Sequence, residues 1–320
     1  MSFLTVQNLY KSFGGNRAVD DVSFALAKGE LLALIGPNGA GKSTCFNMLY
    51  GILAPDKGSV CLDGRELIGM KPRDIWRLGV GRTFQITAVY ASMSVVENVQ
   101  MALISHHRKT FSAFTRAAGL YRDDAMALLD LIGMKPRDIW RLGVGRTFQI
   151  TAVYASMSVV ENVQMALISH HRKTFSTFTR AARLYRDDAM ALLNLIGMKD
   201  QAHRAANILA YGDLKRLELA VAMAHDPALL LMDEPTAGMA PGERRALMKL
   251  TADIVAERGV SVLFTEHDMD VVFENAHRIL VLNRGQLLAE GSVDDVRANP
   301  AVQEVYLGGG TTFGGDGDHA

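Results

Sequence analysis

The segment LLALIGPNGAGKS, residues 31–43, joins a run of apolar residues to a glycine-rich loop that ends in lysine and serine. Residues 36–43 match the pattern G-x-x-x-x-G-K-[ST]. We predict a buried strand over 31–35 and a helix over 42–53, which place the loop between a strand and a helix N-terminus. A loop of this pattern in this position binds phosphate.

The composition of the loop suits the phosphates of a nucleotide. Glycines allow backbone N–H groups to turn inward around phosphate oxygens, and the helix N-terminus adds the positive end of a dipole. Lys42 is expected to contact the β- and γ-phosphates, and the Ser43 hydroxyl is expected to bind Mg²⁺. The predicted nucleotide-binding residues of this segment are Gly36, Pro37, Asn38, Gly39, Ala40, Gly41, Lys42, Ser43 and Thr44.

A second apolar strand, in residues 229–235 (LLLMDEP), ends in two carboxylates. Ligands bind at the carboxyl ends of strands in open α/β sheets, so Asp233 is expected to hold Mg²⁺ through water. Glu234 is placed to orient or deprotonate the attacking water. The strand over 260–264 is followed by His267, which could reach the γ-phosphate and stabilise its developing charge.

Alternating strands and helices surround these motifs and indicate an α/β fold. Residues 59–62 with the turn Asp63-Gly64 predict a hairpin, and the turn Asn283-Arg284-Gly285 lies between two predicted strands. Further strands are predicted at 3–8, 21–26, 59–62, 80–84, 228–232, 279–282 and 286–289, and helices at 72–78, 214–225 and 241–258.

The middle of the chain contains a tandem repeat. Residues 67–130 recur as 131–194, a shift of 64 positions with three differences. Solenoid proteins usually contain more than two copies of a shorter unit, so this repeat argues against a solenoid. Each copy is expected to carry an amphipathic helix (116–131, 180–195) and, on the helix before it, a capping box: Ser94 with Glu97, and Ser158 with Glu161.

The overall composition excludes several classes of protein. Lys and Arg together number 34, as do Asp and Glu, and this balance argues against a dedicated nucleic-acid binder. The two cysteines make no disulfide framework and fit a reducing cytosol. We expect no signal peptide, no membrane span (which needs about 18 apolar residues) and a flexible glycine-rich tail at 308–320.

The order of the motifs resembles that of the ATP-binding cassette (ABC) family over nearly the whole chain. The matching segments are the phosphate loop, Gly81-Arg82-Thr83-Phe84-Gln85, Leu209-Ala210-Tyr211-Gly212-Asp213, the acidic strand and His267. The resemblance implies one ABC ATPase domain over 1–307, with a nucleotide-binding core at 1–88 and 208–307. That core would contain a mixed sheet, flanking helices and an antiparallel β subdomain, beside a helical subdomain at 89–207 enlarged by the duplicated segment. ATP and Mg²⁺ are the implied cofactors, and ATP hydrolysis is the implied reaction.

The resemblance also implies how two subunits share ATP. In the family the signature loop, here at Ala210, Tyr211 and Gly212, caps the γ-phosphate of ATP held by the opposite subunit, in a head-to-tail dimer. Ala210 stands where the family commonly has serine, and Ala240 stands where its D-loop has aspartate. Phe13 is the best match to the aromatic residue that stacks on adenine, with Tyr10 second.

Within the family, the chain resembles the ATPase of bacterial branched-chain amino acid importers, the LivG type. The segments that carry this likeness are Ser12-Phe13-Gly14-Gly15, Gly81 to Gln85, Leu209 to Gly212, Ala237-Gly238-Met239 and Val305-Tyr306-Leu307-Gly308. The likeness implies a second ATPase subunit, two membrane permeases and a solute-binding protein as partners. It places the chain peripherally on the cytoplasmic face of the bacterial inner membrane. Amide and urea importers have similar ATPases.

The repeat supplies two candidates, Gln85 and Gln149, for the glutamine that in the family touches Mg²⁺ and water and receives the push from the permease. Only one of the two segments can occupy the strand position in the sheet. Gln85 keeps the connection from the hairpin at 59–64, and Gln149 keeps the connection to the helix before the signature loop. We favour Gln85. We expect ATP binding to survive the duplication and coupled transport to be impaired. The alternatives are an inactive variant that only binds nucleotide and a soluble ABC ATPase outside transport.

Overall fold

The computed structural model describes residues 2–83, 157–170 and 185–307. The chain divides into two compact units, one formed by Met1–Arg82 with Ala228–Ala320 and the other by Thr83–Pro227. No helix among the described residues is long and apolar enough to cross a membrane.

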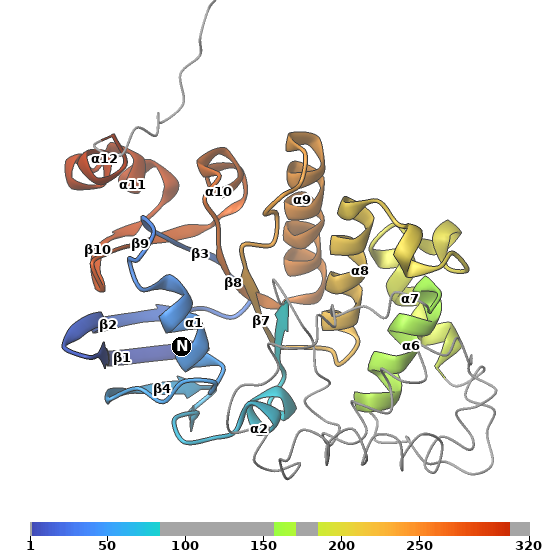
Figure 1. Cartoon of the computed structure of the whole chain (residues 1–320), viewed down its shortest axis with the longest axis horizontal. Helices are drawn as coiled ribbons and strands as arrows, with labels where there is room; N and C mark the ends of the chain where they lie inside the picture. Colours follow the sequence, from blue (N-terminus) through green and yellow to red (C-terminus); the bar gives the residue numbers. More distant parts are fainter. Residues whose placement is uncertain (1, 84–156, 171–184, 308–320) are drawn as a thin grey trace, which may run out of the picture. The chain divides into compact units, whose positions relative to one another are not determined.

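The first unit is built on a mixed sheet whose strand order is β10-β9-β3-β8-β7-β6 (Figure 1). Its central strands, β3 (Leu31–Ile35), β8 (Ser261–Thr265) and β7 (Leu229–Asp233), run parallel and are buried except at Asp233. Parallel strands covered on both faces have such continuous apolar sequences. The outer strands are β9 (Arg278–Asn283), β10 (Gln286–Gly291) and β6 (Val80–Thr83).

A smaller antiparallel sheet of order β2-β1-β4-β5 completes the strands of this unit. It consists of β1 (Leu4–Phe13), β2 (Asn16–Leu26), β4 (Lys57–Leu62) and β5 (Arg65–Glu66). β1 and β2 are longer than the strands predicted at 3–8 and 21–26, because their pairing continues through register shifts to the turn at Gly14 and Gly15. The predicted mixed sheet and antiparallel β subdomain are therefore confirmed.

Six helices lie among the described residues of the first unit. They are α1 (Lys42–Leu49), α2 (Pro72–Arg77), α9 (Pro241–Arg258), α10 (Met269–Asn275), α11 (Val293–Ala298) and α12 (Pro300–Leu307). The prediction that the first helix extends to residue 53 was wrong. Gly51 turns the chain with a φ of 72°, and the amides of Ile52 and Leu53 bond back to the Asn47 carbonyl. The short helices α10 to α12 were not predicted.

The described part of the second unit is helical. α6 (Val159–His170) packs on α7 (Arg186–Leu195) and α8 (Tyr211–Met223), with short 3₁₀ turns at Lys199–Gln201 and Ala206–Ile208. The predicted capping box before α6 is present: the Ser158 amide donates to the Glu161 carboxylate at 2.8 Å, and the Glu161 amide bonds back to the Ser158 hydroxyl.

Among the described residues, the first copy of the repeat provides α2 and β6, and the second copy provides α6 and most of α7. Gln85 and Gln149, the first capping box at Ser94 and Glu97, the helix predicted at 116–131 and the tail at 308–320 lie outside the described residues. The predicted extents of the core and the helical subdomain remain predictions.

Candidate nucleotide-binding site

The phosphate loop joins β3 to α1, as predicted, and its glycines are required by its backbone. Gly36, Gly39 and Gly41 all have positive φ, at 150°, 80° and 102°. A Cβ atom at Gly36 would lie 2.2 Å from the Leu282 carbonyl oxygen, and one at Gly41 would lie 2.3 Å from that of Ala18. A side chain at either position would therefore displace neighbouring backbone and disturb the loop.

Lys42 folds back into this loop. Its Nζ donates hydrogen bonds to the carbonyl oxygens of Gly36 at 2.6 Å and Pro37 at 3.1 Å, and only 6% of the residue is exposed. Burial lowers the pKa of Lys42, while the carboxylates of Glu234 and Asp233 act in the opposite direction. The ammonium thus lies in a negative field beside a loop of backbone dipoles, where phosphate oxygens can replace the carbonyl partners.

Asp233 ends β7, and two neighbours orient its carboxylate. The Thr265 hydroxyl donates to one oxygen at 2.8 Å, and Arg82 donates to the other at 3.4 Å. The same guanidinium donates to the Asn47 side chain on α1 at 3.0 Å. Burial lowers the pKa of Arg82, and Asp233 opposes that shift. Arg82 therefore links the acidic strand to the helix that follows the phosphate loop.

Glu234 and His267 meet directly. His267 Nε2 lies 2.8 Å from Glu234 Oε1, and both side chains are partly exposed. Glu234 has a φ of 47°, a left-handed conformation that is uncommon for a residue with a side chain and is often found at functional sites. Its amide is held by the Thr265 hydroxyl at 3.0 Å and the Thr265 carbonyl at 3.1 Å.

A buried carboxylate fixes the loops that carry this pair. Glu266 accepts hydrogen bonds from the Thr236 amide at 2.8 Å, the Thr236 hydroxyl at 2.6 Å and the His267 amide at 3.2 Å. Only 4% of Glu266 is exposed, and these donors satisfy the buried charge. Sequence reasoning assigned no role to Glu266, Thr265 or Arg82. The signals in the sequence were the position of Thr265 and Glu266 just before His267 and the place of Arg82 in the family-like segment Gly81 to Gln85.

The residues expected to hold Mg²⁺ fit that ion chemically. Ser43 is exposed at the first turn of α1, and Asp233 presents an oriented carboxylate, so both offer the oxygen ligands that Mg²⁺ prefers. Within the described ranges no three His, Cys, Asp or Glu residues cluster as a metal site. One carboxylate with nucleotide phosphates is the usual manner of binding Mg²⁺.

The aromatic residue expected to stack on adenine is accessible. Phe13 ends β1 and is 51% exposed, with Lys11 Nζ 5.7 Å from the centre of its ring. A ring so exposed can receive a flat base on one face. Tyr10, the second candidate, is less exposed. The choice of Phe13 remains a prediction.

The signature residues belong to the second unit and begin α8. Ala210 is the N-cap residue and makes no side-chain capping bond. Tyr211 is half exposed, with Lys215 Nζ 5.6 Å from its ring centre, and Gly212 is buried. A helix N-terminus at which Ala210 and Tyr211 are exposed suits an anion.

The loop before α9 is tied to the residue that follows His267. Arg244 Nε donates to the Met239 carbonyl, and its Nη1 donates to the Asp268 carboxylate, both at 2.7 Å. The Ala240 amide donates to the Glu243 carboxylate at 3.2 Å. The D-loop position, although it lacks aspartate, is therefore held within the same subunit.

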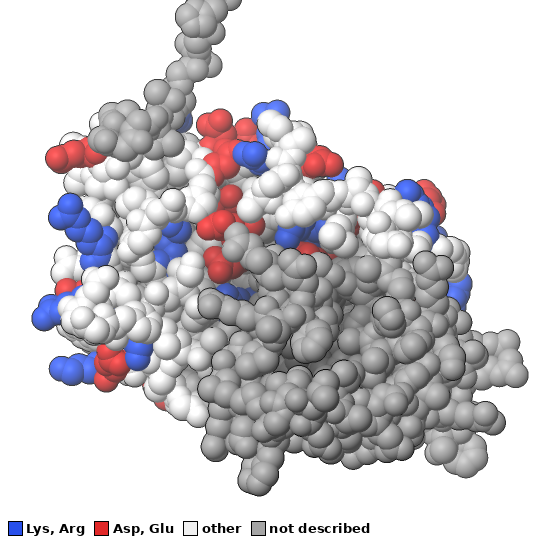
Figure 2. Space-filling view, in the orientation of Figure 1, with Lys and Arg blue, Asp and Glu red and all other residues white. Residues whose placement is uncertain are grey.

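On the face drawn in Figure 2, basic and acidic side chains of the described residues are interspersed. This distribution agrees with the equal numbers of Lys plus Arg and Asp plus Glu in the chain. Within the site, Lys42 interacts with the carboxylates of Glu234 and Asp233, and Arg82 interacts with that of Asp233.

Two family models match the chain. The model described as "ABC transporter" matches residues 19–237, and the model described as "Branched-chain amino acid ATP-binding cassette transporter" matches residues 286–311. The first match includes the phosphate loop and the acidic strand. The second includes β10 and the two C-terminal helices.

Curated relatives match over nearly their full length. The chain is 34% identical over 305 residues to the high-affinity branched-chain amino acid transport ATP-binding protein LivG of Salmonella typhimurium, covering 95% of this chain and 97% of that one. It is 33% identical to the corresponding protein BraF of Pseudomonas aeruginosa with the same coverage. Crystal structures of an ATP-binding cassette from an ABC transporter, nucleotide-free and with ADP, each match with a TM-score of 0.64 at 25% identity, covering 96% of this chain and 99% of theirs.

Proposed function

We propose, from the premise that this chain belongs to the ABC transporter family, that its ATP hydrolysis energises a membrane importer of branched-chain amino acids. The chain is an ABC-type ATPase. The transported substrate is the proposed part, and it is supported by the similarity to LivG and BraF and by the C-terminal match over 286–311.

The observation that best supports ATP hydrolysis is the 2.8 Å contact between Glu234 and His267, which lies beside the oriented carboxylate of Asp233. Glu234 accepts a proton from the attacking water, and His267 holds the Glu234 carboxylate and reaches the developing charge on the γ-phosphate. Lys42 exchanges its carbonyl partners for phosphate oxygens.

Mg²⁺, when bound, would offset charge on the β- and γ-phosphates, and Ser43 and Asp233 would hold it. Arg82 and Thr265 keep the Asp233 carboxylate in one orientation for this purpose. Gln85 is the further proposed ligand, with Gln149 as its alternative from the second copy of the repeat.

The proposed assembly places this chain at the cytoplasmic face of a bacterial inner membrane. A second ATPase subunit binds head to tail, so that Ala210, Tyr211 and Gly212 of one subunit contact the ATP of the other. Two permease subunits take up the conformational change, and a solute-binding protein delivers the substrate. An exposed signature helix start and an exposed Phe13 support this arrangement.

Transport by the reconstituted complex tests the proposal. The chain would be purified with its permeases, placed in vesicles with the solute-binding protein, and assayed for ATP-dependent uptake of labelled leucine, an amide and urea. The proposal expects leucine uptake that needs ATP. Uptake of an amide or urea but not leucine would refute the substrate, and a complex that hydrolyses no ATP would refute the function.

We also propose that the repeat impairs coupled transport while ATP binding survives. The phosphate loop, Asp233, Glu234 and His267 all lie outside residues 67–194. A matched variant lacks residues 131–194 and keeps one copy. The two forms should bind ATP with similar affinity, and the single-copy form should transport faster per ATP hydrolysed. Equal transport per ATP would contradict the proposal.

A further inference from the structure

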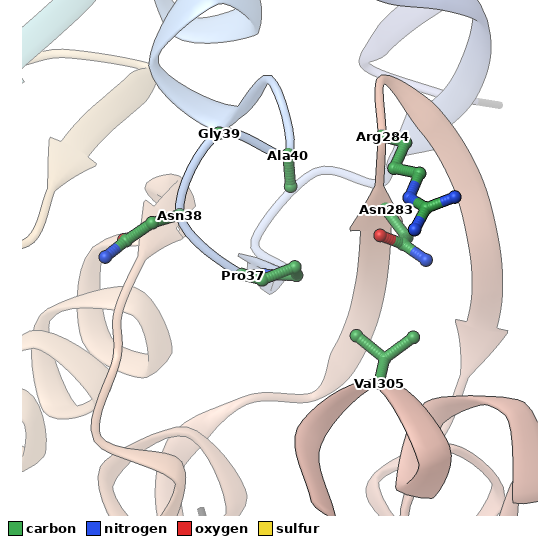
Figure 3. A pocket seen from close by; sticks show the side chains of 7 residues that line it. All are labelled: Pro37, Asn38, Gly39, Ala40, Asn283, Arg284 and Val305. Carbon is green, nitrogen blue, oxygen red and sulfur yellow. The ribbon is translucent and has the colours of Figure 1, made fainter. Parts of the chain in front are cut away.

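The phosphate loop and the loops that carry Glu234 and His267 are held in shape by different groups. In the phosphate loop the Gly285 amide donates to the Ala40 carbonyl at 3.0 Å, and Lys42 binds backbone carbonyl oxygens. This loop also borders a pocket of about 330 Å³, which α12 and the turn between β9 and β10 line as well (Figure 3). The loops after β7 and β8 are instead joined to each other by side chains.

Four consecutive residues at the end of β8 are each bonded to the segment that follows β7. The pairs, in chain order, are Thr265 with Glu234, Glu266 with Thr236, His267 with Glu234, and Asp268, through Arg244, with Met239. The row is possible because β7 and β8 are parallel neighbours in register. It joins the two loops along their length.

Glu266 binds both loops at once. Its Oε1 accepts from the Thr236 amide at 2.8 Å and from the Thr236 hydroxyl at 2.6 Å, and its Oε2 accepts from the His267 amide at 3.2 Å. Thr236 is buried, with 1% of its surface exposed. Hydrogen bonds to a carboxylate are stronger than those between neutral groups. One buried side chain therefore sets the distance between the backbone of His267 and the residue two positions after Glu234.

The backbone of Glu234 needs such a restraint. Its left-handed φ of 47° is unfavourable for a residue with a Cβ atom and persists only where neighbouring contacts impose it. On one side the Thr265 hydroxyl holds the Glu234 amide, and on the other the Ala237 amide donates to the Glu234 carbonyl at 3.2 Å. Thr236 lies within that turn, so Glu266 fixes the side of the turn that Thr265 does not reach.

We propose that Glu266 is a positioning residue for ATP hydrolysis. By binding Thr236 and the His267 amide together, it keeps Glu234 in its left-handed conformation and within hydrogen-bonding distance of His267. It acts through these two residues and therefore affects kcat rather than ATP affinity, which depends on the phosphate loop. This role rests on the proposed function of Glu234 as the base and is independent of the transported substrate.

Three substitutions test the proposal. Glu266→Ala removes all three hydrogen bonds. Glu266→Gln keeps one oxygen that can accept from both donors of Thr236, but its amide nitrogen cannot accept a hydrogen bond. Thr236→Val keeps the size of the side chain and removes only the 2.6 Å bond. The double variant of Glu266→Ala with Thr236→Val shows whether the two residues act together.

Two controls separate positioning from stability and from the environment of the phosphate loop. Ser261→Ala removes a buried hydroxyl that accepts from the Gly29 amide at 2.9 Å, at the opposite end of β8. Arg284→Ala changes an exposed side chain that lines the pocket beside the phosphate loop. Arg284 follows β9, and β3 lies between β9 and β8 in the sheet. Each full-length protein would be assayed for Tm, for ATP binding by calorimetry, and for KM and kcat in the assembled complex.

Glu266→Ala should lower kcat by about 10- to 100-fold, the loss expected when a catalytic group is misplaced by about 1 Å, with ATP affinity nearly unchanged. Glu266→Gln should retain more of the parental kcat than Glu266→Ala. Thr236→Val should lower kcat by about 3- to 10-fold, the range for one lost hydrogen bond. It should cause no further loss in the Glu266→Ala protein, because its hydroxyl then has no acceptor there. Ser261→Ala should lower Tm, and both controls should keep the parental kcat.

Parental kcat in Glu266→Ala would overturn the proposal. So would independent, additive losses in the double variant, or a control that loses as much kcat as Thr236→Val, because hydrolysis would then follow general stability. If Glu266→Ala does not fold, the other two substitutions decide, and parental kcat in both would overturn the proposal. Hydrolysis at the parental rate by Glu234→Gln, measured alongside, would refute the proposed function instead.

Discussion

His267 Nε2 lies 2.8 Å from Glu234 Oε1, although the two residues follow different strands of the sheet. The contact exists because β7 and β8 are parallel neighbours in register, with Asp233 paired to Thr265. Adjacent strand ends therefore deliver the base and the histidine to one point. This point lies at the carboxyl edge of the sheet, where open α/β sheets bind their ligands.

Replacing His267 by alanine should lower kcat for ATP hydrolysis by about 10²- to 10³-fold, the usual cost of losing one group that stabilises the transition state. ATP affinity should change little, because Lys42 and the loop are intact. His203→Ala is the matched control, since His203 is exposed and belongs to the second unit. Steady-state ATPase rates would measure both, and a His267→Ala enzyme with parental kcat would rule out the role of this contact.

Thr265→Val should slow hydrolysis by about 10-fold or more, because one hydroxyl serves both Asp233 and the Glu234 amide. Loss of a buried hydroxyl with two partners also costs about 1–3 kcal/mol of folding free energy. Thr251→Val makes the same change in α9, where the hydroxyl donates to the Leu247 carbonyl. ATPase assays and thermal unfolding would compare them; equal rates for the two variants would count against the bridging role of Thr265.

Arg244→Ala should lower Tm more at low salt than at high salt. The ion pair with Asp268 is partly exposed, so screening weakens it, and its removal is expected to cost about 1 kcal/mol at most. Lys249→Ala removes the exposed pair with Asp253 on the same helix and should have almost no effect. Thermal unfolding at two NaCl concentrations checks this. A salt-independent loss would show that Arg244 acts only through the Met239 carbonyl.

The stability of the nucleotide-free protein should depend on pH through Lys42. Its folded pKa is lowered from 10.5, mainly by burial, so above its folded pKa the unfolded chain binds more protons at this site. Stability from this group is therefore greatest above pH 10.5 and is lost as the pH falls through the folded pKa. Compared with Lys42→Met, the parent should gain stability as the pH rises toward 10.5. Urea unfolding of both proteins over that range measures the difference, and a constant difference would contradict it.

The strand, glycine loop and helix of the phosphate site could be predicted because the pattern is local. The contacts that complete the site could not. Arg82 reaches Asp233 only because β6 pairs beside β7, and the Gly285 amide reaches the Ala40 carbonyl only because β9 pairs beside β3. Such contacts depend on sheet order and tertiary packing, which leave no periodic signal in the sequence.

The predicted ends of the first helix and of β1 and β2 were wrong for a similar reason. The sequence pattern predicted that the first helix extends to residue 53. Gly51 instead adopts a left-handed conformation, and it packs so closely on Met70 and Ile75 that a Cβ atom would clash. β1 and β2 exceed their predicted lengths because their bulges break the alternation that a strand prediction follows. The capping box at Ser158 and Glu161 was predictable, since both partners lie within one helical turn.

ATP turnover by Glu234→Gln, compared with ATP binding by the same protein, tests the central claim most directly. The amide keeps the size of the side chain but cannot accept the proton of the attacking water, so hydrolysis should fall by about 10²- to 10⁴-fold. Filter binding or calorimetry should show ATP retained with parental affinity or tighter. Hydrolysis at the parental rate in Glu234→Gln would contradict the assignment of Glu234 as the base of an ABC-type ATPase.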